Sequence, residues 1–199
     1  MSPLLIAAGL AALMLGGKKA MDLSNSADWA RFIFSEVTSA LPPQVSLKGR
    51  VIIVAQAAFE SGWGKAAWAA IHGNNLFNIT TCQGKSATCA DGWTGAYLDQ
   101  ENADWSYRAD GSRVRIAQRW RSYPTFRASI EDYWNFINRP KYAAGIPSLI
   151  AGDLPGFLTA LRAGGYFTLP LYSTPTTQGY VPQMQAVVNT TARFLNVSV

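Results

Sequence analysis

Glu60 is the residue whose type and position most favour proton-transfer chemistry. It lies in the last turn of a predicted helix, beside Phe59 and Trp63. The negative pole of the helix macrodipole and the reduced hydration beside aromatic rings both raise the pKa of a carboxyl group. A carboxylic acid that stays protonated near neutral pH can donate a proton to a departing sugar oxygen, as glycoside cleavage requires. Taken alone, the position is more typical of an ordinary exposed residue at a helix end.

The histidine and cysteine content excludes several other chemistries. His72 is the only histidine, which excludes His-based zinc clusters and Ser-His-Asp triads and favours a structural role for His72 itself. Cys82 and Cys89 lie in a stretch rich in Gly, Ser and Thr. Their spacing favours a disulfide-closed surface loop, and hence an oxidising compartment, over a metal site or two free thiols. No metal and no organic cofactor is expected.

Apolar periodicity predicts the helices that must position Glu60. Its own helix is expected to begin near Ser46 and to end at Gly62, where glycine can adopt a left-handed turn. Further helices are predicted from apolar residues at helical spacing and from Pro and Gly stops. They are expected from about Trp29 to Pro42, from Phe126 to Asn138, from Leu154 to Ala163 with Asp153 as cap, and roughly from Gln178 to Leu195.

The segment from residue 78 to about 121 has a different pattern. Helical periodicity fades, Asp-Gly pairs occur at 91 and 110, and polar and apolar residues alternate around 104–108 and 113–116. This pattern predicts a small β lobe with hairpins. We therefore expect an α+β, mainly helical fold in which residues 22–199 form one domain with a single sizeable core.

The N-terminal segment 1–21 is expected to be an appendage of this domain. Its first 17 residues are apolar without a break and are followed by Lys18 and Lys19, whereas a secretory signal carries its charge before the apolar run. A helix from Leu4 to Leu15 would extend about 18 Å, against a hydrocarbon core of about 30 Å. Residues 3–17 are therefore interpreted as a short apolar helix that anchors the chain to a membrane. Burial against a protein of a delivery assembly is the alternative.

The overall charge favours an anionic polymer as partner. Lys and Arg outnumber Asp and Glu by 17 to 12, giving a net charge of +5 and a pI near 9.4. The aromatic residues are spread among isolated Arg residues and do not form the clustered basic stripe of a nucleic-acid groove. Aromatic platforms for sugars in a cell envelope fit at least as well, so no nucleic-acid partner is expected. A charge that serves solubility alone is an equal alternative.

Four segments follow one another in the order of the motifs of a known family. Residues 56–64, QAAFESGWG, are followed by 74–79, NNLFNI, then by 120–133 with WRSYP and SIEDY, and by 165–172, GYFTLPLY. Together they resemble glycoside hydrolase family 73, the flagellar-type and autolysin-type N-acetylglucosaminidases, over roughly residues 26–197. Asn78 replaces a glycine of the family pattern and Leu169 an aspartate. Because Asn tolerates positive φ better than most residues, the turn at Asn78 is expected to survive.

The resemblance implies both a fold and a reaction. It implies a lysozyme-like fold with a groove between the helices and the β lobe, and hydrolysis of the β-1,4 bond after N-acetylglucosamine in bacterial peptidoglycan. Glu60 would be the general acid, and Tyr166 the tyrosine beside it that positions substrate or stabilises the transition state. The groove would be lined by Trp63, Asn75, Phe77, Tyr123 and Tyr172, for which simple core packing is the alternative.

The identity of the second acid stays open. The family usually takes it from the β lobe, where Asp99, Glu101 and Asp104 all lie in the plausible window. Matching the turn at 110–111 to the family's hairpin places the expected position near Tyr107, and Asp104 is preferred narrowly as the nearest carboxylate. An inverting enzyme would hold its two carboxyl groups about 6.5 to 9.5 Å apart, and a retaining one about 5 to 5.5 Å. Participation of the substrate's acetamido group, or release of an anhydro product, is the alternative without such an acid.

Two rival functions use the same fold. The first is a muramidase or lytic transglycosylase with the same glutamate, and the second is a catalytically silent wall-binding protein. The apolar N-terminus and the predicted disulfide lead us to expect the enzyme at a membrane, facing the periplasm or the cell exterior, or as a component of a phage particle.

Overall fold

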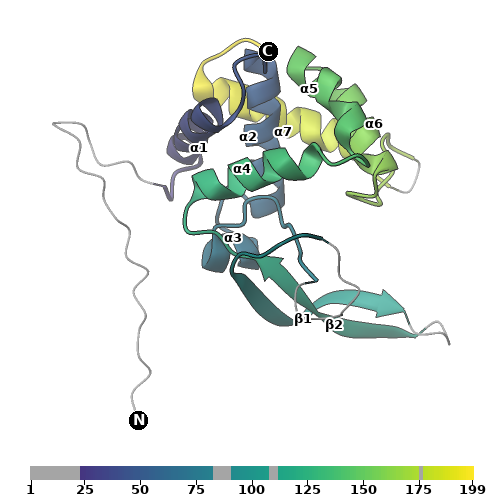
Figure 1. Cartoon of the computed structure of the whole chain (residues 1–199). Helices are drawn as coiled ribbons and strands as arrows, with labels where there is room; N and C mark the ends of the chain where they lie inside the picture. Colours follow the sequence, from purple (N-terminus) through teal and green to yellow (C-terminus); the bar gives the residue numbers. More distant parts are fainter. Residues whose placement is uncertain (1–22, 83–90, 108–111, 175–176) are drawn as a thin grey trace.

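The computed structural model describes residues 23–82, 91–107, 112–174 and 177–199 (Figure 1). Two antiparallel strands form a small sheet beside a helical body, which confirms the predicted α+β, mainly helical fold with a small β lobe. The elements are α1 (Ser26–Ala40), α2 (Leu47–Ser61), α3 (Trp68–Gly73), β1 (Tyr97–Tyr107), β2 (Arg113–Arg121), α4 (Phe126–Ile137), the 3-10 helix η1 (Ala143–Gly145), α5 (Ile146–Ala151), α6 (Leu154–Ala163) and α7 (Tyr180–Leu195).

Three features predicted from the sequence fall outside the described residues. These are the apolar segment 1–21, Cys89 of the predicted Cys82–Cys89 disulfide, and the turn at 110–111. Within the part that is described, no helix has both the length and the apolar character needed to cross a membrane.

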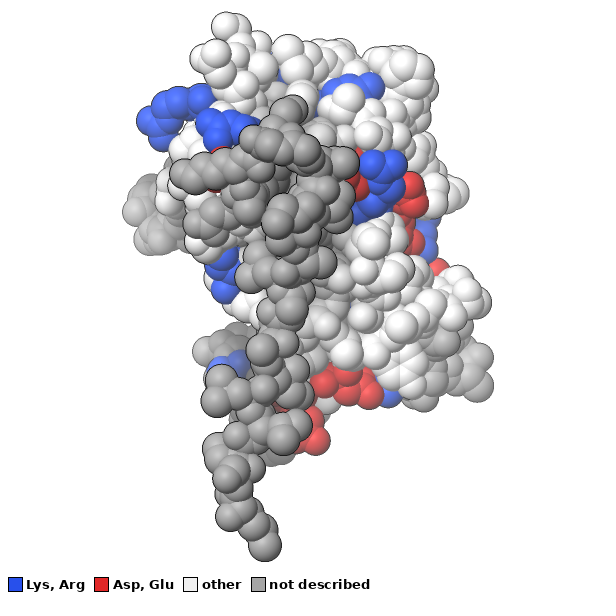
Figure 2. All heavy atoms as spheres, turned by 90° about the vertical axis from the view of Figure 1, so that its left-hand side faces the viewer, with Lys and Arg blue, Asp and Glu red and all other residues white. Residues whose placement is uncertain are grey.

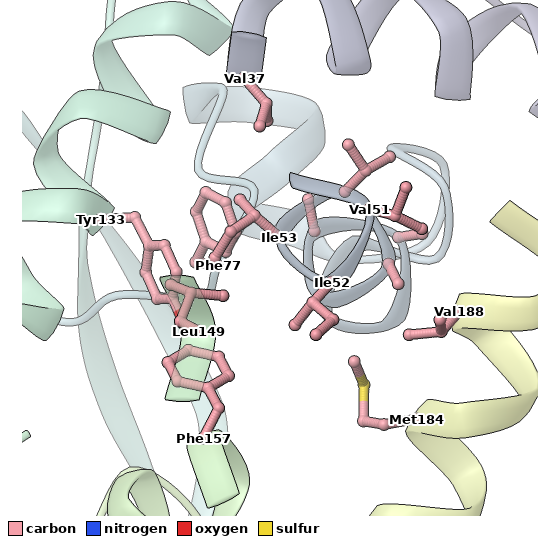
Figure 3. Packing of buried hydrophobic residues seen from close by; sticks show 14 of the residues in the cluster. Val37, Val51, Ile52, Ile53, Phe77, Tyr133, Leu149, Phe157, Met184 and Val188 are labelled. Atoms are coloured by element: carbon pink, nitrogen blue, oxygen red, sulfur yellow. The ribbon is translucent and has the colours of Figure 1, made fainter. Parts of the chain in front are cut away.

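Helix α2 forms the centre of the helical body (Figure 1). Its residues from Val51 to Ala58 are all buried, so the helix is enclosed on every side and α1, α5 and α7 pack against it. A Cβ atom at Gly49 would collide with the backbone oxygen of Leu149, so glycine allows α5 to approach α2 closely. Figure 3 shows the resulting core, in which Val51, Ile52 and Ile53 of α2 pack with Val37, Phe77, Tyr133, Leu149, Phe157, Met184 and Val188.

The ends of the helices follow the predicted signals. The Ser46 hydroxyl accepts a hydrogen bond from the Gly49 amide at 3.1 Å, and the Asp153 carboxylate accepts one from the Gly156 amide at 3.2 Å. These contacts satisfy backbone donors that the first turn of a helix leaves without partners. The predicted starts of α2 and α6 are therefore confirmed.

The β lobe is a single hairpin with an irregular register. Gln100 of β1 lies opposite Gln118, whereas Asp104 lies opposite Ile116, so four positions along β1 correspond to two along β2. Extra residues in one strand form a bulge, which bends the strand and redirects its side chains. The segment after α3 extends the lobe, since Thr80 forms an antiparallel bridge with Trp120.

The surface carries charges of both signs. Figure 2 shows small groups of Lys and Arg side chains, some of them beside Asp and Glu side chains, on a largely uncharged face. An ion pair links α1 to α4, because the Arg127 guanidinium lies 2.8 Å from the Glu36 carboxylate. Exposed pairs of this kind stabilise a fold only slightly.

Candidate active site

A cleft of about 710 Å³ lies where the helical body meets the β lobe. The helical body contributes the end of α2, the end of α4 with the turn that follows it, the loop 165–169 and the start of α7. The segment 77–82, Asp91 and strand β2 contribute the remainder. Glu60, Phe77, Asn78, Tyr166 and Tyr180 are among the residues that line it.

The end of α2 fixes the position of Glu60 at this cleft. Gly62 adopts the left-handed conformation with φ 58°, and its amide donates to the carbonyl of Ala58. The hydroxyl of Ser61 then accepts from the Gly64 amide at 2.8 Å while donating to the Ala57 carbonyl. Helix α2 therefore ends at Ser61, one residue after the acid, so Glu60 lies in the last turn as predicted and its side chain projects from a fixed helix end.

Glu60 is a partly buried acid held by two hydrogen-bond donors. The Tyr180 hydroxyl donates to Oε1 of Glu60 at 2.8 Å, and the Asn78 amide lies 3.4 Å from Oε2. Burial raises the pKa of Glu60, and the hydrogen bonds from Tyr180 and Asn78 lower it by a smaller amount. The net pKa of Glu60 is raised, which favours the protonated form that a general acid needs.

Asn78 keeps the turn that the sequence motif assigns to a glycine. Its φ is 51°, which confirms the expected left-handed turn. The side chain also donates to the backbone carbonyl of Glu60 at 2.7 Å. A glycine has no side chain to make this bond, so Asn78 adds a direct link between the segment after α3 and the acid.

The tyrosine that contacts the acid is Tyr180. Tyr166 does line the cleft, but its hydroxyl donates to the carbonyl of Phe77 at 2.9 Å. Tyr172 is 60% exposed and is absent from the described lining of the cleft. The motif predicts Tyr172 as a groove residue, and this prediction is wrong. Tyr180 is the first residue of α7, so the start of the predicted C-terminal helix is the local signal that could have indicated it.

Of the five residues expected to line the groove, Phe77 does so, stacked on Tyr133 with ring centroids 3.9 Å apart. Asn75 is fully buried and donates to the carbonyls of Ile79 and Arg121 at 2.8 and 2.9 Å. Trp63 packs its ring edge to face with Trp29 and is absent from the described lining of the cleft. These contacts give Asn75 and Trp63 a packing role.

The three carboxylates considered for the second acid lie on β1. Asp99 pairs with Arg119 at 2.7 Å, and Glu101 is exposed; neither belongs to the described lining of the cleft. Asp104 sits where the register becomes irregular, and its side chain lies outside the described part of the structure.

The other carboxylate that lines the described cleft is Asp91. Burial raises its pKa, but hydrogen bonds from Thr81 and the Trp93 amide and the charge of Arg121 outweigh this, so the pKa is lowered. Asp91 is therefore an ionised group. The sequence marked it only as part of a turn, because its position in the cleft depends on distant residues.

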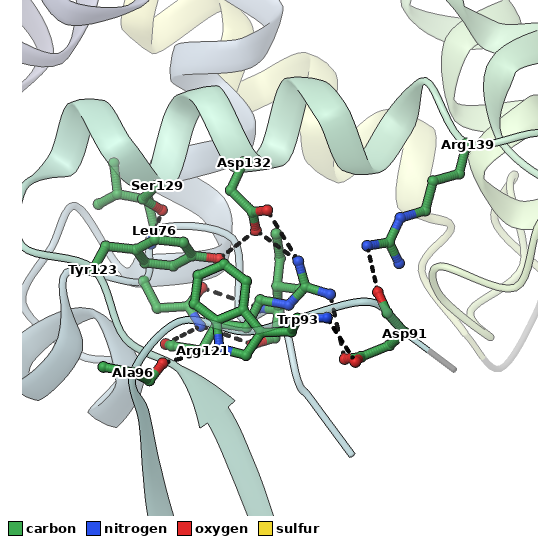
Figure 4. Close-up of polar contacts among 11 residues, drawn as sticks. Leu76, Asp91, Trp93, Ala96, Arg121, Tyr123, Ser129, Asp132 and Arg139 are labelled. Carbon is green, nitrogen blue, oxygen red and sulfur yellow. Dashed lines mark hydrogen bonds and ion pairs between the residues drawn. The ribbon is translucent and has the colours of Figure 1, made fainter. Parts of the chain in front are cut away.

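Arg121 connects Asp91 to helix α4 (Figure 4). Its guanidinium, only 1% exposed, lies 2.9 Å from Asp132 and 3.3 Å from Asp91. The Tyr123 hydroxyl donates to the same Asp132 carboxylate at 2.6 Å, and the Trp93 ring covers the guanidinium at 4.7 Å. Tyr123 thus joins a buried network behind the cleft, and the network ties the β lobe to the helical body.

Among the described residues, no group of three or more His, Cys, Asp and Glu side chains is arranged to hold a metal ion. His72 lies on α3 with its ring 5.0 Å from that of Trp68.

The relatives of the chain include peptidoglycan hydrolases and an exo-glucosaminidase. The chain is 30% identical over 125 residues to the peptidoglycan hydrolase FlgJ of Vibrio parahaemolyticus, covering 61% of this chain and 36% of that protein. It is 31% identical over 128 residues to the exo-glucosaminidase LytG of Bacillus subtilis, covering 61% and 39%. The chain spans about a third of the length of the curated relatives it matches.

A solved structure supports the same relationship. The crystal structure of a peptidoglycan hydrolase mutant from Sphingomonas sp. A1 is 27% identical, with a TM-score of 0.51 and coverage of 80% of this chain and 97% of that one. Residues 46–192 match the family model described as glucosaminidase, mannosyl-glycoprotein endo-beta-N-acetylglucosaminidase. This matched range contains the cleft from Glu60 to Tyr180, and the chain therefore belongs to the glucosaminidase family.

Proposed function

We propose that the chain hydrolyses the β-1,4 bond after N-acetylglucosamine in bacterial peptidoglycan, with Glu60 as the general acid. The observation that carries this proposal is the raised pKa of Glu60 at the lining of an open cleft. A protonated carboxyl there can donate its proton to the glycosidic oxygen as the bond breaks. The names of the related FlgJ and LytG proteins support peptidoglycan as substrate and glucosaminidase as activity.

Tyr180 and Asn78 are proposed to orient the acid. Both donate to the carboxyl group of Glu60, so they hold its oxygens in fixed positions relative to the cleft. Tyr166 is proposed to contact the substrate or stabilise the transition state from the same cleft, with its ring held by the bond to Phe77. Such prior orientation reduces the rearrangement needed at the transition state.

Asp104 remains the proposed second acid, and Asp91 is the alternative that the structure adds. Two observations support Asp91: it lines the cleft, and its lowered pKa favours the ionised form. A carboxylate in this role would activate a water molecule on the face of the sugar opposite Glu60. Measuring turnover for Asp104→Asn and for Asp91→Asn distinguishes the two candidates. The variant that lacks the general base should lose about a hundred-fold or more in turnover.

The test of the reaction is digestion of purified peptidoglycan by the full chain, by Glu60→Gln and by Glu131→Gln. Products are reduced with borohydride and identified by mass spectrometry. We expect chains that end in reduced N-acetylglucosamine, lost with Glu60→Gln and retained with Glu131→Gln, whose side chain is exposed on α4. Reduced muramic acid ends or anhydro ends would instead establish a muramidase or a lytic transglycosylase. Wall binding without products would leave a silent binding protein.

The proposed substrate requires that the chain work outside the cytoplasm. We propose that residues 3–17 hold it at a membrane, facing the periplasm or the cell exterior, or in a delivery assembly such as a phage particle. The apolar composition of this segment supports the proposal. Placing a charge in it with Leu10→Lys should release the chain from sedimented membranes, and equal sedimentation of both forms would contradict an anchor.

A further inference from the structure

Two cationic side chains beyond the end of α4 line the cleft without a part in the proposed proton transfer. Arg139 and Lys141 share this cleft with Glu60. The Lys141 ammonium lies 4.6 Å from the ring centroid of Tyr142, and the Arg139 guanidinium lies 4.9 Å from that of Phe136. Both cations are therefore held against aromatic rings of the cleft wall.

Neither cation is neutralised by a protein carboxylate within the described residues. The ion pairs found there, at a limit of 4.0 Å, include neither Arg139 nor Lys141. Arg139 does donate to the backbone carbonyl of Asp91 at 2.9 Å, which directs its guanidinium toward the β lobe (Figure 4). Lys141 is exposed, so its ammonium is open to solvent.

Among the other charged groups that line the described cleft, Arg121 and Asp91 form an ion pair, and Asp132 behind the cleft adds one negative charge. Arg121 lies between the carboxylates of Asp91 and Asp132. Glu60 has a raised pKa, which favours its neutral form. The wall formed by Arg139 and Lys141 is consequently the positive part of the described cleft, and it attracts anions.

The proposed substrate carries its negative charge on one of its two sugars. N-acetylglucosamine is neutral, whereas N-acetylmuramic acid bears a lactyl carboxylate when free and a stem peptide with carboxylates when substituted. We propose that Arg139 and Lys141 form a subsite for a carboxylate carried by the muramic acid residue. The inference rests on the proposed function and adds a determinant of substrate specificity to it.

The experiment measures binding with the full chain in a Glu60→Gln background, so that strands stay intact. Three probes are compared: soluble strands with stem peptides, strands stripped of peptides by an amidase, and peptide-bearing strands whose carboxylates are converted to methylamides. Lys141→Gln should weaken binding of a carboxylate-bearing strand about three- to ten-fold and leave binding of the methylamide strand unchanged. Loss confined to peptide-bearing strands assigns the stem peptide, and loss on stripped strands assigns the lactyl group.

Two matched variants complete the test. Lys141→Arg keeps the charge and should restore binding, and Lys48→Gln removes an exposed lysine outside the cleft and should change nothing. An equal loss on the methylamide strands, or no loss on any strand, would overturn the subsite. Release of reducing ends by the unmutated chain is measured separately on the same strands. Its absence would count against the proposed function and leave the binding comparison intact.

Discussion

At the scale of single residues, the acid is set by contacts from three separate parts of the chain. Glu60 comes from the end of α2, Asn78 from the segment after α3 and Tyr180 from the start of α7. Burial raises the pKa of Glu60, and the two donors moderate the rise. The balance decides the pH range in which a general acid works, because it must be protonated to act.

Replacing Tyr180 with Phe tests this balance. The substitution removes a hydrogen bond that lowers the pKa of Glu60, so this pKa should rise further. Activity of a general acid is lost as pH rises through its pKa, so the alkaline limb of the kcat profile should move to higher pH. We also expect kcat to fall about ten-fold as orientation is lost.

Tyr172→Phe is the control for this measurement, because it removes a hydroxyl from an exposed ring outside the described cleft lining. It should leave both kcat and the pH profile unchanged. An alkaline limb that stays in place with Tyr180→Phe would refute the role given to that hydroxyl.

At the scale of elements, the buried Arg121 holds the β lobe against α4. Arg121→Met should lower the free energy of unfolding by about 2 to 3 kcal/mol, since Asp132 and Asp91 lose their shared partner. Arg119→Met breaks a pair with Asp99, a carboxylate that is 49% exposed, and should cause a much smaller loss. Urea unfolding of both variants measures the difference. Equal losses would show that Arg121 does not join the two parts.

The longer elements could be predicted from the sequence because their signals are local. Ser46 and Gly62 bound α2, and Asp153 begins α6, as predicted. The sequence does not predict the six-residue helices α3 and α5, because six residues are too few to show a helical repeat of apolar positions. The bulge in β1 explains why motif spacing could not select the second acid there, because extra residues shift every later side chain.

At the scale of the whole molecule, the site could be predicted only where a motif is contiguous. Glu60, Phe77 and Asn78 lie within two short motifs, and all three line the cleft. Tyr180 and Asp91 depend on contacts across the fold, with Tyr180 standing 120 residues from the acid it contacts. Local patterns carry no information about such pairs.

The raised pKa of Glu60 also bears on the stability of the whole molecule. Below the pKa that Glu60 has when unfolded, both states are protonated and the acid is neutral in each. As pH rises above that value the unfolded state ionises first, so the folded state loses stability. Glu60→Gln should therefore raise the free energy of unfolding at pH 7 by on the order of 1 kcal/mol. The gain should vanish near pH 4, and thermal unfolding at both pH values measures it. A gain that is the same at both would contradict the ionisation argument.

The role of Glu60 as general acid is tested most directly by varying the leaving group. Turnover by the full chain, by Glu60→Gln and by Glu131→Gln is compared on peptidoglycan and on a 2,4-dinitrophenyl glycoside of N-acetylglucosamine oligomers. Dinitrophenolate can leave as an anion without being protonated. The sugar leaving group of peptidoglycan must instead receive a proton as the bond breaks. We predict that Glu60→Gln loses about a hundred- to ten-thousand-fold on peptidoglycan and little on the aryl glycoside, with Glu131→Gln unchanged on both. An equal loss on the two substrates would contradict proton donation by Glu60.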